Sequence, residues 1–104
     1  MLFEIRTYTI RPGRLPAYVA DFERRGLPVI SRYAQLIAYW IAEVGALNQV
    51  IHVWGYRDAA HRAEQRALLY ADPDWLEGYL PAALDDVESQ ESRLVTGAPF
   101  SPLR

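Results

Sequence analysis

Polar and aromatic side chains alternate along two β-rich stretches of the chain, one at its start and one at its middle. Arg6 is suited to hold an anionic or carbonyl oxygen, because guanidinium groups form strong charge-assisted hydrogen bonds. His52 is suited to move a proton near neutral pH, and Trp54 with Trp40 is suited to stack on a flat ligand. The residues of this candidate site are Glu4, Arg6, Tyr8, Trp40, Asn48, His52 and Trp54.

The same residues have a purely structural interpretation. A charged group on a central strand that a second subunit covers must be paired, since an unpaired buried charge is very costly. Glu4 and Arg6 would then form an ion pair at a dimer interface, and His52 would be held by hydrogen bonds. Structural networks of this kind perturb a histidine as readily as an active site does. The catalytic residues therefore stay unknown, with His52 as the only candidate.

Metal and cofactor sites have little support in the sequence. There is no cysteine, and no carboxylate stands at the usual ligand spacing from His52 or His61. We expect His61 on a helix and His52 on a strand face, so a shared metal is not predicted. Haem ligation by His52 is equally unsupported, and we predict neither a metal nor another cofactor.

The other aromatic and charged side chains that stand out have purely structural explanations. Trp75, Tyr79 and Tyr18 stand at the spacing of core positions on helices and are expected to pack in the core. Arg62 and Arg66 are one helical turn apart and are expected on a solvated helix face.

The hydrophobic periodicity predicts the elements that would position these residues. Alternation with β-branched and aromatic residues predicts strands, and i, i+3, i+4, i+7 spacing predicts amphipathic helices. The strands are expected at residues 2–10, 36–44, 48–56 and 88–96, and the helices at residues 15–26, 58–71 and 73–80. A helix stop is expected at Gly26 and helix N-caps at Asp58 and Asp72.

The order β-α-β-β-α-β predicts an α+β, ferredoxin-like fold with a four-stranded antiparallel sheet in the order 4-1-3-2 and both helices on one face. We expect seven apolar residues in the helix-covered core: Ile5, Ile37, Ile41, Ile51, Val53, Val19 and Phe22. The candidate site, with Glu4, Arg6, Tyr8, Trp40, His52 and Trp54, is expected on the opposite face. An exposed aromatic face of this kind needs a partner, and a homodimer, sheet against sheet, is the simplest one.

Composition limits the other partners. A chain of 104 residues predicts one domain spanning residues 1–104. The eleven basic residues are all arginine, they form no patch and the net charge is −2, so nucleic acid is not expected. No apolar run reaches the roughly 18 residues of a membrane helix, and the N-terminus lacks the basic start of a signal peptide. A cytoplasmic protein is expected.

Three ordered blocks of the sequence resemble the NIPSNAP family. They are residues 4–13 (EIRTYTIRPG), residues 43–45 (EVG) with 47–54 (LNQVIHVW) and Tyr56, and residues 89–94 (SQESRL) with 98–102 (APFSP). The resemblance implies a ferredoxin-like protomer that pairs into a dimeric α+β barrel, and dimers of this superfamily sometimes stack further. The superfamily includes cofactor-free antibiotic-biosynthesis monooxygenases, muconolactone isomerases, haem-degrading enzymes and chlorite-dismutase relatives. Eukaryotic members of the NIPSNAP family are linked to mitochondria and to protein recruitment.

Two functions follow as hypotheses, because a fold alone does not fix a function. In the first, the protein binds a small aromatic or carbonyl compound in a polar-aromatic pocket, with cofactor-free monooxygenase or isomerase chemistry as its extension. In the second, it is a non-catalytic homodimeric interaction or recruitment module whose barrel is filled by side chains. An enclosed pocket that touches Arg6 or His52 would favour the first, and a solid interior would favour the second.

Overall fold

A computed structural model describes all residues from Met1 to Arg104 and contains one four-stranded antiparallel sheet. Its strands are β1 (Leu2–Ile10), β2 (Gln35–Ile41), β3 (Gln49–Tyr56) and β4 (Val87–Thr96). They lie in the order β2-β3-β1-β4, so β1 and β3 are central. This is the predicted order, and the ferredoxin-like α+β protomer is confirmed.

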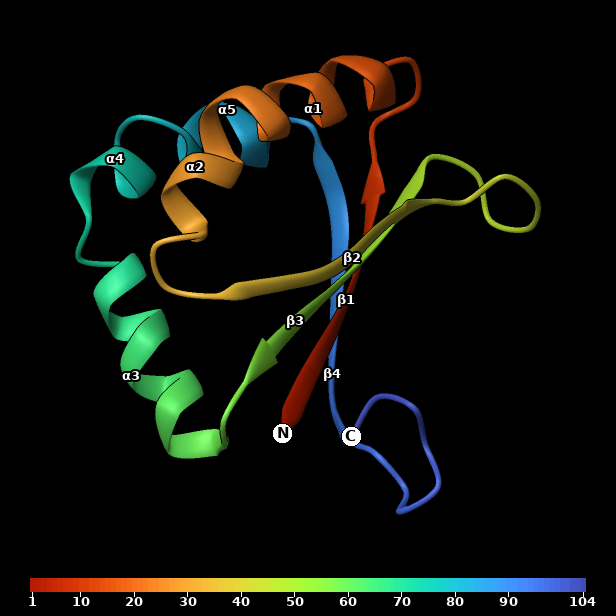
Figure 1. Ribbon diagram of the computed structural model, residues 1–104. Helices are drawn as coiled ribbons and strands as arrows, with labels where there is room; N and C mark the ends of the chain where they lie inside the picture. Colours follow the sequence, from red (N-terminus) through yellow and green to blue (C-terminus); the bar gives the residue numbers. More distant parts are fainter.

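The helical segments all lie on one face of the sheet (Figure 1). They are α1 (Leu15–Asp21), the π-helical turn η1 (Phe22–Gly26), α2 (Leu27–Ile30), α3 (Ala59–Leu69), α4 (Pro73–Leu76) and α5 (Leu80–Asp85). The predicted N-caps are confirmed. The Asp58 carboxylate accepts a hydrogen bond from the His61 backbone N–H at 2.8 Å, and the Asp72 carboxylate accepts one from the Asp74 N–H at 2.9 Å.

The predicted helix stop at Gly26 is wrong, because the chain stays helical through η1 into α2. Gly26 has an ordinary helical φ of −86° and is buried. A Cβ at this position would stand 2.8 Å from Tyr79 Cζ and 2.9 Å from Phe22 Cδ2. Glycine is therefore required here by the close approach of the Tyr79 ring, and a helix end is not the reason.

The register places the polar residues of β1 and β3 on one face. Glu4 stands opposite Trp54, Arg6 opposite His52 and Tyr8 opposite Val50. Residues opposite each other in antiparallel strands share a face. This face packs against the helices, and the core between them includes Ile10, Val50, Trp54, Tyr56, Tyr18, Phe22, Trp75 and Tyr79.

The predicted assignment of the two sheet faces is therefore inverted. Ile5, Ile51 and Val53 lie on the face without helices. The charged and aromatic side chains of β1 and β3 lie on the face that the helices cover. The prediction placed Glu4 and Arg6 on the face opposite the helices. In the structure these charges are paired on the helix-covered face, where the large aromatic side chains are also buried. Val19 and Phe22 do pack in the helix-side core, as predicted.

A β-bulge in β2 also changes the predicted positions of Ile37 and Ile41, which do not lie in the helix-covered core. The pairing with β3 shifts between Leu36 and Ala38, so Leu36 and Tyr39 share the helix-covered face although they are three residues apart. Ile37 at the bulge contacts the region of Gly55 on the opposite face. Ile41 is in register with the helix-side Val50 but is 44% exposed near the end of β2, so it is not a core residue.

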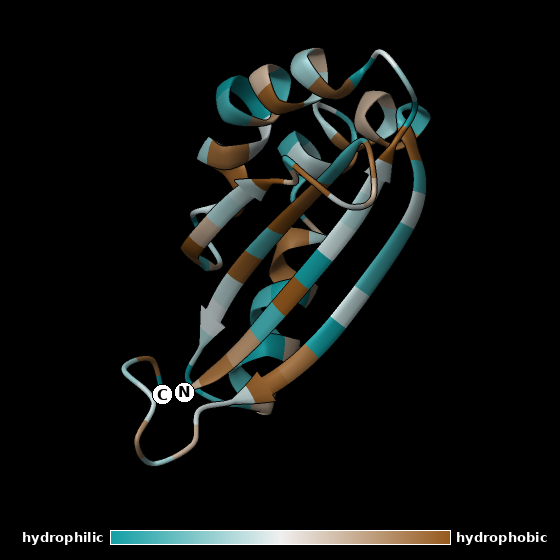
Figure 2. Ribbon diagram, turned by 90° about the vertical axis from the view of Figure 1, so that its right-hand side faces the viewer, coloured by the Kyte–Doolittle hydropathy of each residue, from teal (hydrophilic) through white to brown (hydrophobic).

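The other sheet face is uncovered in this chain (Figure 2). It carries an open apolar groove of about 490 Å³, bordered on one side by the C-terminal tail. The tail lies at the same end of the sheet as the N-terminus in both views (Figures 1 and 2). None of the helices combines the length and the apolar composition that crossing a bilayer requires.

Candidate functional site

A cavity lies between the sheet and the helices, and most of its lining residues are hydrophobic or aromatic. Its volume of about 40 Å³ is room for a few water molecules or for the end of a small ligand. Tyr39 stacks on the His52 imidazole with a centroid distance of 4.9 Å, and Phe22 stacks on the other side of the cluster against Tyr39, also at 4.9 Å. Trp75 and Tyr79 close the helix side, 5.0 Å apart. The aromatic side chains around the cavity therefore pack largely against one another.

Three polar atoms on residues that line this cavity are buried and make no well-formed hydrogen bond within the protein: His52 Nε2, Trp75 Nε1 and Tyr79 Oη. The Tyr18 hydroxyl lies beside Tyr79 Oη without satisfying it. Leaving such an atom unsatisfied costs about 1–3 kcal/mol, and native structures contain few of them. The indole N–H is a donor only, and the phenol can donate. Several such atoms around one cavity indicate that it takes up an acceptor-bearing molecule or ordered water.

The state of His52 follows from its neighbour. Trp54 Nε1–H donates to His52 Nδ1 at 2.6 Å, so Nδ1 must be unprotonated and the proton of the neutral ring resides on Nε2. Burial, and then the charge of Arg6, lowers the pKa of His52 from 6.5 to about 3. His52 is thus an uncharged donor toward the cavity at neutral pH. The predicted role of moving a proton near neutrality does not fit this environment.

The tyrosines on the cavity are also poor proton carriers at neutral pH. Burial raises the pKa of Tyr39 and of Tyr79 far above 10, and it raises the pKa of Tyr8 and Tyr18 as well. The neighbouring Tyr18 hydroxyl adds to the effect on Tyr79. These phenols stay protonated and serve as hydrogen-bonding groups.

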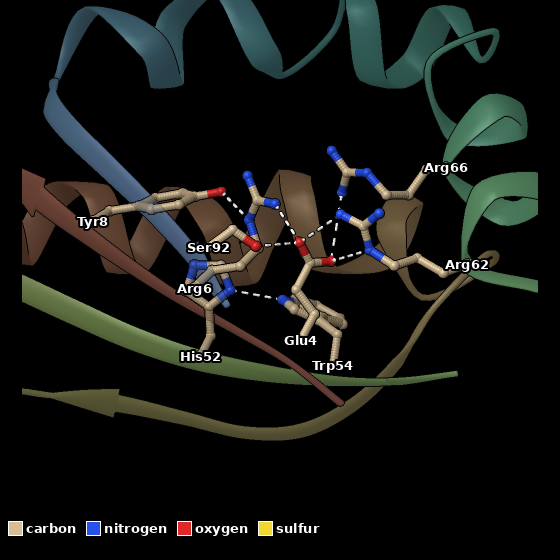
Figure 3. Close-up of polar contacts among 8 residues, drawn as sticks. All are labelled: Glu4, Arg6, Tyr8, His52, Trp54, Arg62, Arg66 and Ser92. Carbon is tan, nitrogen blue, oxygen red and sulfur yellow. Dashed lines mark hydrogen bonds and ion pairs between the residues drawn. The ribbon is translucent and has the colours of Figure 1, made fainter. Parts of the chain in front are cut away.

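A buried charge cluster adjoins the cavity (Figure 3). The Glu4 side chain is fully buried, and Arg62 grips it with two hydrogen bonds, Nε to Oε1 at 3.1 Å and Nη2 to Oε2 at 2.8 Å. Arg6 Nη1 and Ser92 Oγ also donate to Oε2, at 2.7 and 2.6 Å. Arg66 Nη1 lies 4.0 Å from Oε1. The pKa of Glu4 falls to about 2: burial alone would raise it, but hydrogen bonds from Arg62, Ser92 and Arg6 outweigh burial.

The structure brings together five of the seven predicted site residues on the helix-covered face: Glu4, Arg6, Tyr8, His52 and Trp54. Trp40 is on the opposite face and is 55% exposed, so it cannot stack on a ligand beside Trp54. Asn48 precedes β3 in a turn with a φ of 61°, where its backbone carbonyl accepts a hydrogen bond from the Ile10 N–H. It does not line the cavity.

Two arginines of α3 were missed by sequence reasoning, which placed Arg62 and Arg66 on a solvated helix face. The helix turns them to the sheet, while the alanines of α3 are exposed. The stripe 62, 66, 69 has the spacing of a buried helix face and ends at Leu69, which is buried. This stripe was the available signal. Trp75 and Tyr79 were predicted to pack in the core, which they do, but they also border the cavity.

Fold and site together define a class: a ferredoxin-like protomer with a small polar-aromatic cavity between its sheet and its helices. The model of the NIPSNAP family matches residues 3–102. The chain belongs to the NIPSNAP family. It is 31% identical over 104 residues to the human protein NipSnap homolog 3A, covering 99% of this chain and 42% of the human protein. The chain thus spans less than half the length of this curated relative.

Solved structures show the same relationship. A NIPSNAP domain protein from Burkholderia xenovorans is 40% identical, with a TM-score of 0.94 over 98% of this chain and 99% of that chain. A NIPSNAP family protein of unknown function from Agrobacterium tumefaciens is 38% identical, with a TM-score of 0.96 over 100% of this chain and 94% of that chain. A putative antibiotic biosynthesis monooxygenase from Nitrosomonas europaea shares the fold at 11% identity, with a TM-score of 0.69 over 93% of this chain and 98% of that chain.

Proposed function

We propose that the protein binds a small planar organic compound that carries an acceptor oxygen, such as a carbonyl group, in the cavity between sheet and helices. The observation that carries the proposal is the set of three buried, unpartnered polar atoms on one aromatic-walled cavity: His52 Nε2, Trp75 Nε1 and Tyr79 Oη. An acceptor oxygen in their reach would satisfy donors that otherwise destabilise the fold.

The volume and the walls constrain the ligand further. The enclosed space of about 40 Å³ admits only the oxygen-bearing end of a compound, so the rest must extend toward the mouth of the cavity. Tyr39 lies between the His52 and Phe22 rings and stacks on both, so a flat body would contact the edges of this stack. Tyr70 and Leu84 line the cavity and are both more than 40% exposed, so the cavity meets solvent beside them.

Binding and polarisation of a carbonyl fit the cavity better than proton transfer does. Isomerisation needs a base that is unprotonated and basic near neutral pH. His52 has its basic Nδ1 occupied by Trp54 and a lowered pKa, and Glu4 is held by arginines and does not line the cavity. We therefore do not extend the proposal to an isomerase. The neighbour from Nitrosomonas europaea is named a putative monooxygenase, and oxygen consumption with the bound compound would test oxidation here.

The uncovered sheet face is proposed to pair with a second copy of this chain. Its groove includes the apolar side chains of Phe3, Ile5 and Val53, and the large ring of Trp40 is 55% exposed beside them. Exposed apolar side chains grouped on an uncovered sheet face support an interaction site there, and a two-fold contact lets the same face cover itself. The homodimer places the ligand cavities outside the contact, on the helix side of each sheet.

The competing function is an interaction module without a ligand, in which a few water molecules fill the cavity. Native mass spectrometry of freshly purified protein, with denaturation to release bound compounds, separates the two. Ala83 is buried on the cavity wall, whereas the adjacent Ala82 is exposed on α5. We expect a released compound from the wild type and from Ala82→Leu, and none from the cavity-filling Ala83→Leu. Equal recovery from both variants, or none from any of the three proteins, contradicts the proposal.

A further inference from the structure

We propose that the ligand is an anion: a planar carboxylic acid whose carboxylate binds between Arg6 and Arg66 on the cavity lining, while its acceptor oxygen reaches the buried donors. This inference rests on the proposed function and adds the substrate class. The observation behind it is independent of the orphaned donors, because it concerns the balance of charge beside the cavity.

Positive charge is in excess in the cluster around Glu4. Three guanidinium groups, those of Arg6, Arg62 and Arg66, lie within ion-pair distance of one carboxylate. No other carboxylate lies within 4.0 Å of any of the three. One negative charge against three positive charges leaves two that no group of the protein neutralises. Partly buried like charges repel at low dielectric, so an incoming anion is favoured.

The positive charge that Glu4 does not neutralise belongs to the arginines that border the cavity. Arg62 uses Nε and Nη2 for its two-pronged contact with Glu4, and neither residue borders the cavity. Arg6 and Arg66 do border it. Glu4 is the only ion-pair partner of the Arg66 guanidinium, at 4.0 Å, and the Tyr56 hydroxyl lies beside that guanidinium. Arg6 Nη2 makes no hydrogen bond within the protein. Both therefore have N–H donors to offer.

The two arginines are accessible yet shielded. Their side chains are 15% exposed for Arg6 and 24% for Arg66, which lets a ligand reach them while much of the solvent screening is removed. Tyr70 packs against the Arg66 guanidinium at 5.3 Å, and Tyr8 lies 5.3 Å from that of Arg6. These rings hold the guanidinium planes in place for a planar carboxylate.

The cavity lining thus offers two chemically different kinds of donor. Arg6 and Arg66 are cationic, whereas the His52 Nε2–H, the Trp75 indole N–H and the Tyr79 hydroxyl are uncharged. A carboxylic acid with a carbonyl or hydroxyl oxygen at the far side of a flat body matches both kinds. A neutral compound would satisfy only the uncharged donors.

Two probes that differ mainly in charge test the inference: 4-acetylbenzoate and 4-acetylbenzamide. Their Kd values are measured by ¹H–¹⁵N NMR titration, following the indole N–H of Trp75 in the cavity, with that of Trp40 on the opposite sheet face as an internal control. Arg66→Gln removes one cation of the cavity lining. Arg57→Gln, an exposed arginine without an ion pair, is the control of equal net charge. Arg66→Lys restores the charge without the planar fork.

We expect the benzoate to bind at least roughly tenfold more tightly than the benzamide, as charge-assisted hydrogen bonds imply. Arg66→Gln should remove that advantage, Arg66→Lys should restore part of it, and Arg57→Gln should leave it unchanged. Equal affinity of both probes for the wild type, or an advantage that survives Arg66→Gln, overturns the carboxylate inference and leaves the proposed function intact. If neither probe moves the Trp75 signal, the inference and the proposed function both fail.

Discussion

Replacing His52 by glutamine should flatten the dependence of stability on pH between pH 6.5 and 4.5. Burial and the charge of Arg6 lower the pKa of His52 from 6.5 to about 3 in the folded protein. Around and below pH 6.5 His52 binds a proton in the unfolded chain, but in the folded chain it stays unprotonated down to about pH 3. The free energy of unfolding therefore falls as the pH falls through this window. Well above pH 6.5 neither state is protonated, and His52 then contributes no pH dependence.

The magnitude follows from the size of the shift. One pH unit corresponds to about 1.4 kcal/mol once His52 is fully protonated in the unfolded chain. Because His52 is already half protonated there at pH 6.5, acidification from pH 6.5 to 4.5 should cost the wild type about 2 kcal/mol through His52 alone. The carboxylates do not interfere. Glu4 has its pKa lowered from 4.5 to about 2, so its stabilisation is lost only below pH 4.5.

Urea denaturation followed by tryptophan fluorescence measures the effect at fixed protein concentration, since a dimer would make the midpoint depend on concentration. Glutamine keeps an acceptor for Trp54 Nε1–H but does not titrate. His61→Gln, on α3 outside the cavity, serves as the control and should keep the slope of the wild type. A wild type that is flat across the window would refute the reasoning, as would a His52→Gln variant with an unchanged slope.

Three further variants test other parts of the structure. Glu4→Gln should lower the free energy of unfolding by about 3 kcal/mol at pH 7 in chemical denaturation, because it leaves buried guanidinium groups without their counter-charge. Gly26→Ala should cost about 1–3 kcal/mol and abolish ligand binding in the NMR titration, because the new methyl group displaces the Tyr79 ring. Trp40→Glu should convert the proposed dimer into a monomer in sedimentation velocity, whereas Leu68→Glu, exposed on α3, should not.

The Glu4 result has its own internal control. Arg62 makes the two-pronged contact with Glu4, so each single replacement by glutamine removes this contact and leaves the other residue charged. The double variant Glu4→Gln/Arg62→Gln removes both and should be less destabilised than the sum of the singles, by about 0.5–3 kcal/mol. Strict additivity would mean that the contact contributes little.

The strands, their order and the helix caps could be predicted because they depend on local patterns. Alternation marked β1 and β3, and Asp58 and Asp72 marked the starts of α3 and α4. The choice of sheet face could not be predicted in the same way. Period-2 alternation shows that Glu4 and Ile5 point to opposite faces, but both faces of β1 carry apolar groups. The burial of Glu4 depends on partners from three elements, Arg6 of β1, Arg62 of α3 and Ser92 of β4.

The site was predictable only in part for the same reason. Arg6 and His52 could be placed together from strand order and register, whereas the partners that decide their chemistry come from residues far away in the sequence. The Trp54 contact turns His52 from a proton carrier into a neutral donor. The bulge at Ile37 brings Tyr39 onto the His52 ring, and nothing in the sequence of β2 predicts this change of register.

The central claim is that uncharged donors face the cavity and meet an acceptor oxygen of the ligand. A long-range ¹H–¹⁵N spectrum of the His52 imidazole at pH 6, recorded without and with 4-acetylbenzoate, tests it most directly. The predicted result is a neutral ring protonated at Nε2 and not at Nδ1, whose Nε2 signal shifts when the probe is added. An imidazolium, a ring protonated at Nδ1, or an Nε2 signal that the probe leaves unmoved would contradict the claim.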